Sequence, residues 1–112
     1  MSTITTHVLD TSRGRPAAGV PIVLDFRSGT GAWQERGRGM TDADGRLRDL
    51  LKDPLEAGVY RLTFDTAAYF EALGAPAFYP VVAVVFEVTS PAQHHHVPLL
   101  LSPFGYSTYR GS

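Results

Sequence analysis

The chain has 112 residues, of which 44% are hydrophobic and 19% are charged, and its formal net charge is -1. This length and composition predict one folded domain covering residues 1–112 and exclude a disordered chain. Acidic and basic side chains are interspersed, which argues against a nucleic-acid partner and against an anionic membrane surface.

The sequence contains no cysteine, which excludes disulfides and thiol catalysis. No apolar run approaches the roughly 20 residues that a membrane helix needs. The first residues have neither the basic region nor the apolar region of a secretory signal. The sequence therefore predicts a soluble, cytoplasmic protein.

The first third of the chain alternates with the period of β-strands. In Ile4–Asp10, Ile4 and Val8 share one face with Thr6, and Thr5 shares the other with His7 and Leu9. Residues 20–27 alternate more clearly, with the even-numbered apolar residues predicted to face inward. Pro21 suits only the start of a strand or an edge. Residues 32–39 form a weaker third strand.

The middle of the chain combines turn signals, two strands and one helix. Asp44-Gly45 predicts a hairpin turn with Gly45 at positive φ, followed by a short strand from Arg46. Residues 59–66 alternate again, and residues 67–73 form the single helical stretch, with Gly74 suited to its C-cap.

Residues 81–88 are a nearly continuous β-branched run, which predicts a central strand covered on both faces. Together with the last segment of the chain, the pattern gives about eight short strands and one brief helix. This pattern is typical of an all-β sandwich.

The last segment predicts a hairpin in which residues 97–101 pair with residues 104–109 around a turn at Ser102-Pro103. In this register His96 lies opposite Tyr109, on a face whose polar members gather at the open end of the hairpin beside Arg110. A sheet face with an imidazole, a phenol and hydroxyl groups suggests a site and not a core. A slip of one residue would reverse this face.

Three blocks of the sequence resemble the 5-hydroxyisourate hydrolase family, the transthyretin-related enzymes of purine breakdown. The blocks are His7-Val8-Leu9-Asp10 with Gly14 and Pro16, Thr41-Asp42-Ala43-Asp44-Gly45-Arg46, and His96 to the ending Tyr109-Arg110-Gly111-Ser112. The resemblance covers essentially the whole chain, and the terminal Tyr-Arg-Gly-Ser is its most specific mark.

The resemblance implies a transthyretin-like two-sheet β-sandwich that hydrolyses 5-hydroxyisourate to 2-oxo-4-hydroxy-4-carboxy-5-ureidoimidazoline in urate breakdown. It implies a homotetramer, a dimer of dimers, with sites between the dimers. The substrate is already activated, so no metal, cofactor or covalent nucleophile is expected.

The resemblance also implies the residues of the site. Histidine can act as acid or base near neutrality, and arginine can hold a developing oxyanion. Which histidine is the base stays open. The expected catalytic residues are His7, Arg46 and His96, and the expected substrate-binding residues are Tyr109, Arg110, Gly111 and Ser112.

Two other functions remain as alternatives: a small-ligand carrier of the transthyretin type, and a purely structural module. The carrier has a lysine where this chain has His7 and a glutamate where it has Arg46, which favours the enzyme. The family often has His-Tyr-His where this chain has His94-His95-His96. His94 and His96 share a spacing that also suits a metal; His94 and His95 are expected to be solvated or to orient their neighbours.

Overall fold

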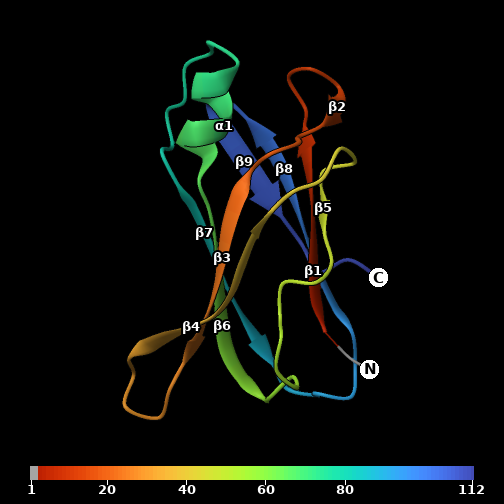
Figure 1. Ribbon diagram of the computed structural model, residues 1–112, viewed down its shortest axis with the longest axis vertical. Helices are drawn as coiled ribbons and strands as arrows, with labels where there is room; N and C mark the ends of the chain where they lie inside the picture. The colour runs from red at the N-terminus through yellow and green to blue at the C-terminus, as the bar shows by residue number, and fades with distance from the viewer. Residues whose placement is uncertain (1–2) are drawn as a thin grey trace.

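The computed structural model describes residues 3–112 and consists of two packed β-sheets with one short helix, in an elongated body of 40 × 27 × 20 Å (Figure 1). The larger sheet contains β1 (Ile4–Asp10), β2 (Arg15–Pro16), β5 (Arg46–Leu47), β8 (His95–Ser102) and β9 (Gly105–Thr108). The smaller sheet contains β3 (Pro21–Arg27), β4 (Trp33–Met40), β6 (Gly58–Phe64) and β7 (Val82–Val88). The predicted all-β sandwich is confirmed.

The larger sheet is organised around β1. This strand pairs in parallel with β8 on one side, and antiparallel with β2 and β5 on the other. The register places Thr5 beside His96, and His7 between Arg46 and Pro98. Because paired residues in neighbouring strands point to the same face, these five side chains share one surface of the sheet.

The core lies between the two sheets and follows the predicted alternation. Val8 and Leu99 from the larger sheet, and Leu24 and Leu62 from the smaller one, are completely buried. The smaller sheet is antiparallel throughout, in the order β4-β3-β6-β7. Pro21 is the first residue of β3, as expected for a residue that cannot donate to the ladder.

The helix α1 (Thr66–Ala72) lies at one end of the sandwich (Figure 1). The side chain of Asp65 accepts a hydrogen bond from the backbone of Ala68, and Gly74 follows the helix with φ of 68°. The Tyr69 hydroxyl donates to Oδ2 of the fully buried Asp10 at 2.7 Å. No helix within residues 3–112 has the length and apolar character needed to cross a bilayer.

The prediction of a doubly covered strand at residues 81–88 was wrong. β7 is an edge strand of the smaller sheet, with Val82 and Val84 buried and Val85 57% exposed. The run misleads because most of its outward residues, Val81, Ala83 and Val85, are also apolar. A continuous apolar pattern therefore hides the alternation of faces.

The turn at Asp44-Gly45 is confirmed, but the hairpin expected from it is not. Gly45 adopts φ of 75° as predicted. The strands before and after it lie in different sheets, however, because β4 pairs with β3 and β5 pairs with β1. This turn therefore carries the chain from one sheet to the other.

The C-terminal hairpin forms with a register two residues away from the predicted one. Ser102 pairs with Gly105, so the turn is centred on Pro103-Phe104. His96 lies opposite Gly111 and not Tyr109. Because the slip is an even number of residues, His96 still points to the predicted face of the sheet.

Candidate functional site

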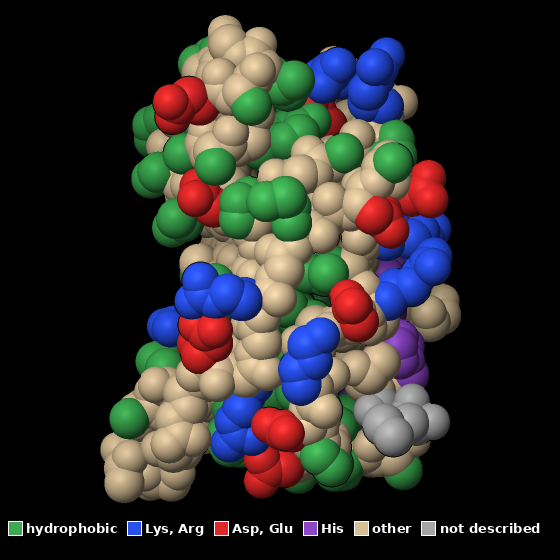
Figure 2. All heavy atoms as spheres, in the orientation of Figure 1, with side chains coloured by type: hydrophobic (Ala, Val, Ile, Leu, Met, Phe, Trp, Pro, Cys, Tyr) green, Lys and Arg blue, Asp and Glu red, His purple; other side chains and the backbone are tan. Residues whose placement is uncertain are grey.

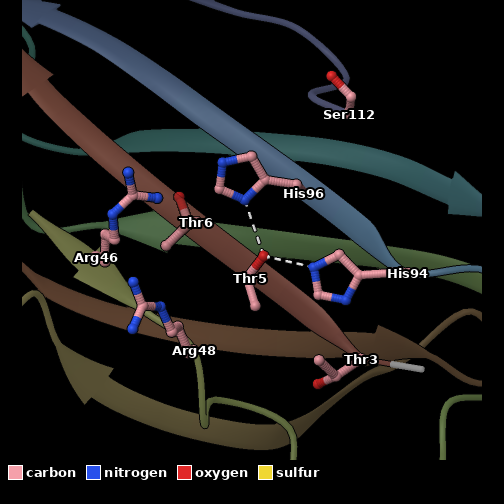
Figure 3. A pocket seen from close by; sticks show the side chains of 8 residues that line it. All are labelled: Thr3, Thr5, Thr6, Arg46, Arg48, His94, His96 and Ser112. Atoms are coloured by element: carbon pink, nitrogen blue, oxygen red, sulfur yellow. Dashed lines mark hydrogen bonds between the residues drawn. The ribbon is translucent and has the colours of Figure 1, made fainter. Parts of the chain in front are cut away.

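An open cavity of about 470 Å³ lies on the outer face of the larger sheet, where β1, β5 and β8 meet (Figure 3). In the space-filling view, histidine and arginine side chains lie close together along one edge of the molecule (Figure 2). The cavity is lined by Thr3, Thr5, Thr6, Arg46, Arg48, His94, His96 and Ser112.

Arg46 is placed by the turn that precedes it. The Asp42 carboxylate accepts hydrogen bonds from the backbone N–H groups of Asp44 at 2.9 Å and Arg46 at 3.0 Å. The bond from Arg46, then that from Asp44, lower the pKa of Asp42 despite partial desolvation. The Gly45 carbonyl accepts from the Val8 N–H at 2.7 Å, which attaches the turn to β1.

Gly45 is required at this position for two reasons. Its φ of 75° is unfavourable for residues with a Cβ atom. A Cβ added there would also lie 2.4 Å from the carbonyl oxygen of Val8. This close approach brings β5, and with it Arg46, directly against β1.

His96 and His94 both contact the hydroxyl of Thr5. The Thr5 Oγ1 atom is 2.8 Å from Nδ1 of His96 and 2.9 Å from Nε2 of His94 (Figure 3). The second ring nitrogen of His96, Nε2, points away from Thr5, toward the side of the cavity where Arg46 lies (Figure 3). His96 is half-buried and His94 is exposed.

The environment of His96 favours its neutral form. Burial lowers the pKa of His96, and the charges of Arg46, His7 and His94 lower it further, against a smaller opposing effect from hydrogen bonding to the Thr5 backbone. A neutral imidazole with a free nitrogen can accept a proton at neutral pH. His7 is not among the residues lining the cavity, but it is the neighbour of Arg46 in the β1–β5 ladder.

The C-terminal residues divide between two places. Ser112 lines the cavity, and Gly111 donates its backbone N–H to the His96 carbonyl at 2.8 Å. A Cβ on Gly111 would lie 2.6 Å from Cδ2 of His96 and 3.2 Å from Cγ of Pro98. The ring of His96 therefore packs against a position where only glycine leaves room.

Tyr109 and Arg110 line a second, smaller hollow of about 200 Å³ between the ends of β7, β8 and β9. His95, which also lines this hollow, is only 5% exposed, so of its two expected roles, solvated or orienting its neighbours, the first does not apply. Its Nδ1 has no hydrogen-bond partner among the described residues. Burial, followed by the charges of Arg110 and His94, lowers the pKa of His95.

Sequence reasoning missed four residues of the cavity, Thr3, Thr5, Thr6 and Arg48, of which Thr5 and Arg48 matter most to its chemistry. Thr5 shares the outward face of β1 with His7, so the alternation of that strand contained the signal. Arg48 lies two residues after Arg46, so its side chain points to the same side of the chain, and it adds a second guanidinium to the cavity.

No group of three His, Cys, Asp or Glu side chains that could hold a metal ion occurs within residues 3–112. The pair His94 and His96, whose spacing suits a metal, turns two of its ring nitrogens toward the Thr5 hydroxyl. The donors present are therefore nitrogen groups that suit an oxygen-rich organic ligand and proton transfer.

The fold and this cavity define a transthyretin-like β-sandwich with a histidine- and arginine-lined site on one sheet. The family model described as HIUase/Transthyretin family matches residues 4–111, and the chain belongs to this family. It is 48% identical to a 5-hydroxyisourate hydrolase of Caulobacter vibrioides over 117 residues, with both chains covered completely.

The similarity extends to a longer protein and to solved structures. The chain is 50% identical to the uric acid degradation bifunctional protein TTL of Arabidopsis thaliana; the match covers 97% of this chain but spans only 37% of that protein. The 5-hydroxyisourate hydrolase of Klebsiella pneumoniae superposes with a TM-score of 0.87 at 39% identity, with both chains fully covered. Sea bream transthyretin superposes with a TM-score of 0.91 at 35% identity, covering 96% of this chain and 93% of that one.

Proposed function

We propose that the protein is a 5-hydroxyisourate hydrolase of urate breakdown, which opens the six-membered ring of its substrate by hydrolysing the N1–C6 amide. The observation that carries this proposal is the cavity that brings His96 and Arg46 together beside His7. The relatives named 5-hydroxyisourate hydrolase, which match the whole chain, support the same reaction.

In the proposed reaction, His96 takes a proton from water and the resulting hydroxide attacks C6 of the substrate. The lowered pKa of His96 suits this role, because the neutral ring is present at neutral pH. The C–N1 bond then breaks, and N1 leaves with a proton that His7 or the protonated His96 delivers. The product gains one water and carries a carboxyl group at the former C6.

Arg46 would stabilise the negative charge that develops on the C6 oxygen. Its guanidinium is permanently charged and can hold a planar oxygen-rich group in a fork. Removing one such donor typically lowers kcat by about 10²–10³-fold. Ser112 would contact substrate or water from the far side of the cavity, whereas Tyr109, Arg110 and Gly111 would support the site from around β9.

The site is completed, in this proposal, by a homotetramer built as a dimer of dimers. The cavity is open on one sheet face, so a single chain encloses substrate on one side only. Large apolar side chains are also exposed: Phe78 and Phe104 are 66% and 67% exposed, and Tyr79 stacks edge-on with Tyr106 at 5.2 Å. Surfaces of this kind are usually covered by another protein surface.

Sedimentation velocity of the purified protein measures the mass of the assembly, and we expect that of a tetramer. A strictly monomeric active species contradicts the proposal.

We also propose a cytoplasmic location, the compartment of a soluble purine-degrading enzyme. Immunoblotting of fractionated cells that express the untagged chain checks this, with a cytoplasmic enzyme as the marker.

The decisive test is a coupled assay with urate and urate oxidase, in which the transient absorbance of hydroxyisourate is followed with and without the protein. We expect a rate of decay that increases in proportion to protein concentration. Hydroxyisourate decay no faster than the spontaneous reaction would contradict the proposal. Binding of hydroxyisourate or thyroxine without any acceleration would instead favour the carrier.

A further inference from the structure

The Thr5 hydroxyl lies between two imidazole rings at the floor of the cavity. Its Oγ1 atom is within hydrogen-bond distance of His94 Nε2, at 2.9 Å, and of His96 Nδ1, at 2.8 Å (Figure 3). Thr5 is 8% exposed, so solvent has little access to this hydroxyl. A hydroxyl has a single proton and can donate to only one of the two rings. For both contacts to be hydrogen bonds, the other ring must donate an N–H to the Thr5 oxygen.

We propose that Thr5 and His94 set the tautomer of His96, keeping a proton on Nδ1 and leaving Nε2 bare. The hydrogen bonds then run in one direction: His96 Nδ1–H donates to Thr5 Oγ1, and the Thr5 hydroxyl donates to His94 Nε2. His94 is a neutral acceptor with its proton on Nδ1. The use of Nε2 as the catalytic base rests on the proposed function, whereas the tautomer itself does not.

The position of Arg46 favours this direction over the reverse. Arg46 lies on the side to which Nε2 points (Figure 3), and its charge is the largest electrostatic influence on His96 after burial. A bare lone pair facing a guanidinium is attracted to it, whereas an N–H group facing it is repelled.

The other charged groups near His96 act in the same sense. If protonated, His7 on β1 and His94 before β8 would each lower the pKa of His96 further. Arg48, which follows β5, lies on the same wall of the cavity as Arg46. No Asp or Glu is among the residues that line this cavity within the described chain. A neutral His96 with its lone pair toward the cations is therefore the state that the surroundings stabilise.

These hydrogen bonds fix the orientation of the His96 ring and connect it through Thr5 to His94. When water attacks the substrate, a proton moves from water to Nε2 of His96 and hydroxide forms a bond to the carbonyl carbon. His96 then becomes an imidazolium whose Nδ1–H already donates to Thr5. Hydrogen bonds in a chain strengthen one another, so the bond from Thr5 to His94 helps to stabilise this charge. Thr5 and His94 are thus positioning residues that act through His96.

The first test reads the tautomer directly by long-range ¹H–¹⁵N NMR of the histidine-labelled full chain near neutral pH, with the His96 signals assigned by substitution. We expect an Nδ1–H tautomer in the wild type and a shift toward Nε2–H in Thr5→Val and His94→Phe. Thr5→Ser, which keeps the hydroxyl, and His94→Gln, whose amide reaches the position of Nε2, should retain the Nδ1–H tautomer. Thr11→Val is the matched control. The Thr11 hydroxyl, just after β1, donates to the Leu101 carbonyl of β8 at 3.1 Å, and this hydrogen bond involves no imidazole.

The second test is kinetic. At metal-bound histidines, loss of the orienting partner typically costs about 10- to 100-fold in affinity or activity. We expect a fall of similar size in kcat for Thr5→Val and His94→Phe, with a smaller change in KM. Thr5→Ser should recover most of kcat. A merely structural role for Thr5 would lower thermal stability in step with activity and would leave the tautomer of His96 unchanged.

The outcomes separate this inference from the proposed function. An Nε2–H tautomer in the wild type, or the same tautomer in wild type, Thr5→Val and His94→Phe, overturns the inference. If the tautomer shifts as expected but the wild type does not accelerate hydroxyisourate decay, the coupling stands and the proposed hydrolase function fails.

Discussion

The two faces of the β1–β8 strand pair do different work. On the inner face Ile4, Val8 and Leu99 are fully buried against the second sheet. On the outer face Thr5 and His96 hydrogen-bond beside an open cavity. Because successive side chains in a strand point to opposite faces, the residues that hold the core also fix the backbone from which the site projects. Packing of the inner face therefore keeps β1 and β8, and with them the site, rigid.

The contrast predicts that an inner-face truncation destabilises the fold without changing the chemistry. Leu99→Ala removes a completely buried side chain next to the outward-facing Pro98. Such truncations typically lower the free energy of unfolding by about 2–5 kcal/mol. Urea denaturation measures this loss. The kcat per folded molecule, measured at a temperature where the variant stays folded, should remain that of the wild type; a large fall in kcat would show that the two faces are not separable.

An outer-face substitution should do the opposite. Arg46→Ala is expected to lower kcat by about 10²–10³-fold, because it removes the cation assigned to the oxyanion. The free energy of unfolding should change little, since the side chain is only half-buried and Asp42 bonds to the backbone of this residue. The urate oxidase-coupled assay gives the rate. Arg48→Ala, which removes the neighbouring guanidinium, is the control, and equal losses in both variants would contradict the specific role of Arg46.

The contact between Gly111 and His96 offers a smaller perturbation of the outer face. Gly111→Ala would place a methyl group 2.6 Å from Cδ2 of His96, so the ring must move. Displacements of about 1 Å can cost as much as 10²-fold in rate, and we expect a fall in kcat of about 10- to 100-fold.

Gly105→Ala is the matched control in the same hairpin, because a methyl group there meets only Ser102 Oγ at 3.8 Å. Wild-type activity in Gly111→Ala, with the His96 NMR signals unmoved, would show that the ring does not depend on this glycine.

The smallest expected effect is on the pH dependence of stability, and it comes from His95, which faces away from the cavity that His96 lines. Burial first, then Arg110 and His94, lower the pKa of His95 in the folded protein. The unfolded chain therefore binds protons at a higher pH than the folded one, and stability is lost as the pH falls from about 6.5, the usual histidine value. His95→Tyr removes this titration, and the adjacent hollow of about 200 Å³ offers space for the larger ring.

We expect the unfolding free energy of His95→Tyr to fall less steeply than that of the wild type between pH 7 and about pH 5. Urea denaturation across this range measures both slopes. His96, whose pKa is also lowered, titrates in both proteins and cancels in the comparison. Parallel slopes would show that His95 does not change its proton occupancy on unfolding.

The sequence predicted the alternating strands well and the partners of those strands less well. Residues such as Ile22 and Leu24 in β3 lie inside as expected, because a strand with one apolar face turns that face toward the core. β7 was misjudged because Val85 is apolar and exposed. The partner of β5 could not be predicted from Asp44-Gly45, since a local turn does not determine which sheet its flanks join.

The candidate site shows the same limit. His96 and Arg46 were predicted and do meet at one cavity, whereas Tyr109 lies in the second hollow because the hairpin register differs by two residues. Thr5 was missed because its importance arises from a contact with residues about 90 positions away. Contacts of this kind depend on parallel pairing, which leaves no local pattern in the sequence.

The parallel pairing of β1 with β8 also has a consequence during synthesis. Thr5 and His96 are separated by 91 positions, and β1 leaves the ribosome long before its partner exists. At roughly 5–20 residues per second, β1 waits on the order of 5 to 18 seconds with its edge unpaired. Nascent chains stalled before β8 should therefore hold an exposed, aggregation-prone strand that chaperones can recognise, and the sheet can close only after β8 has emerged.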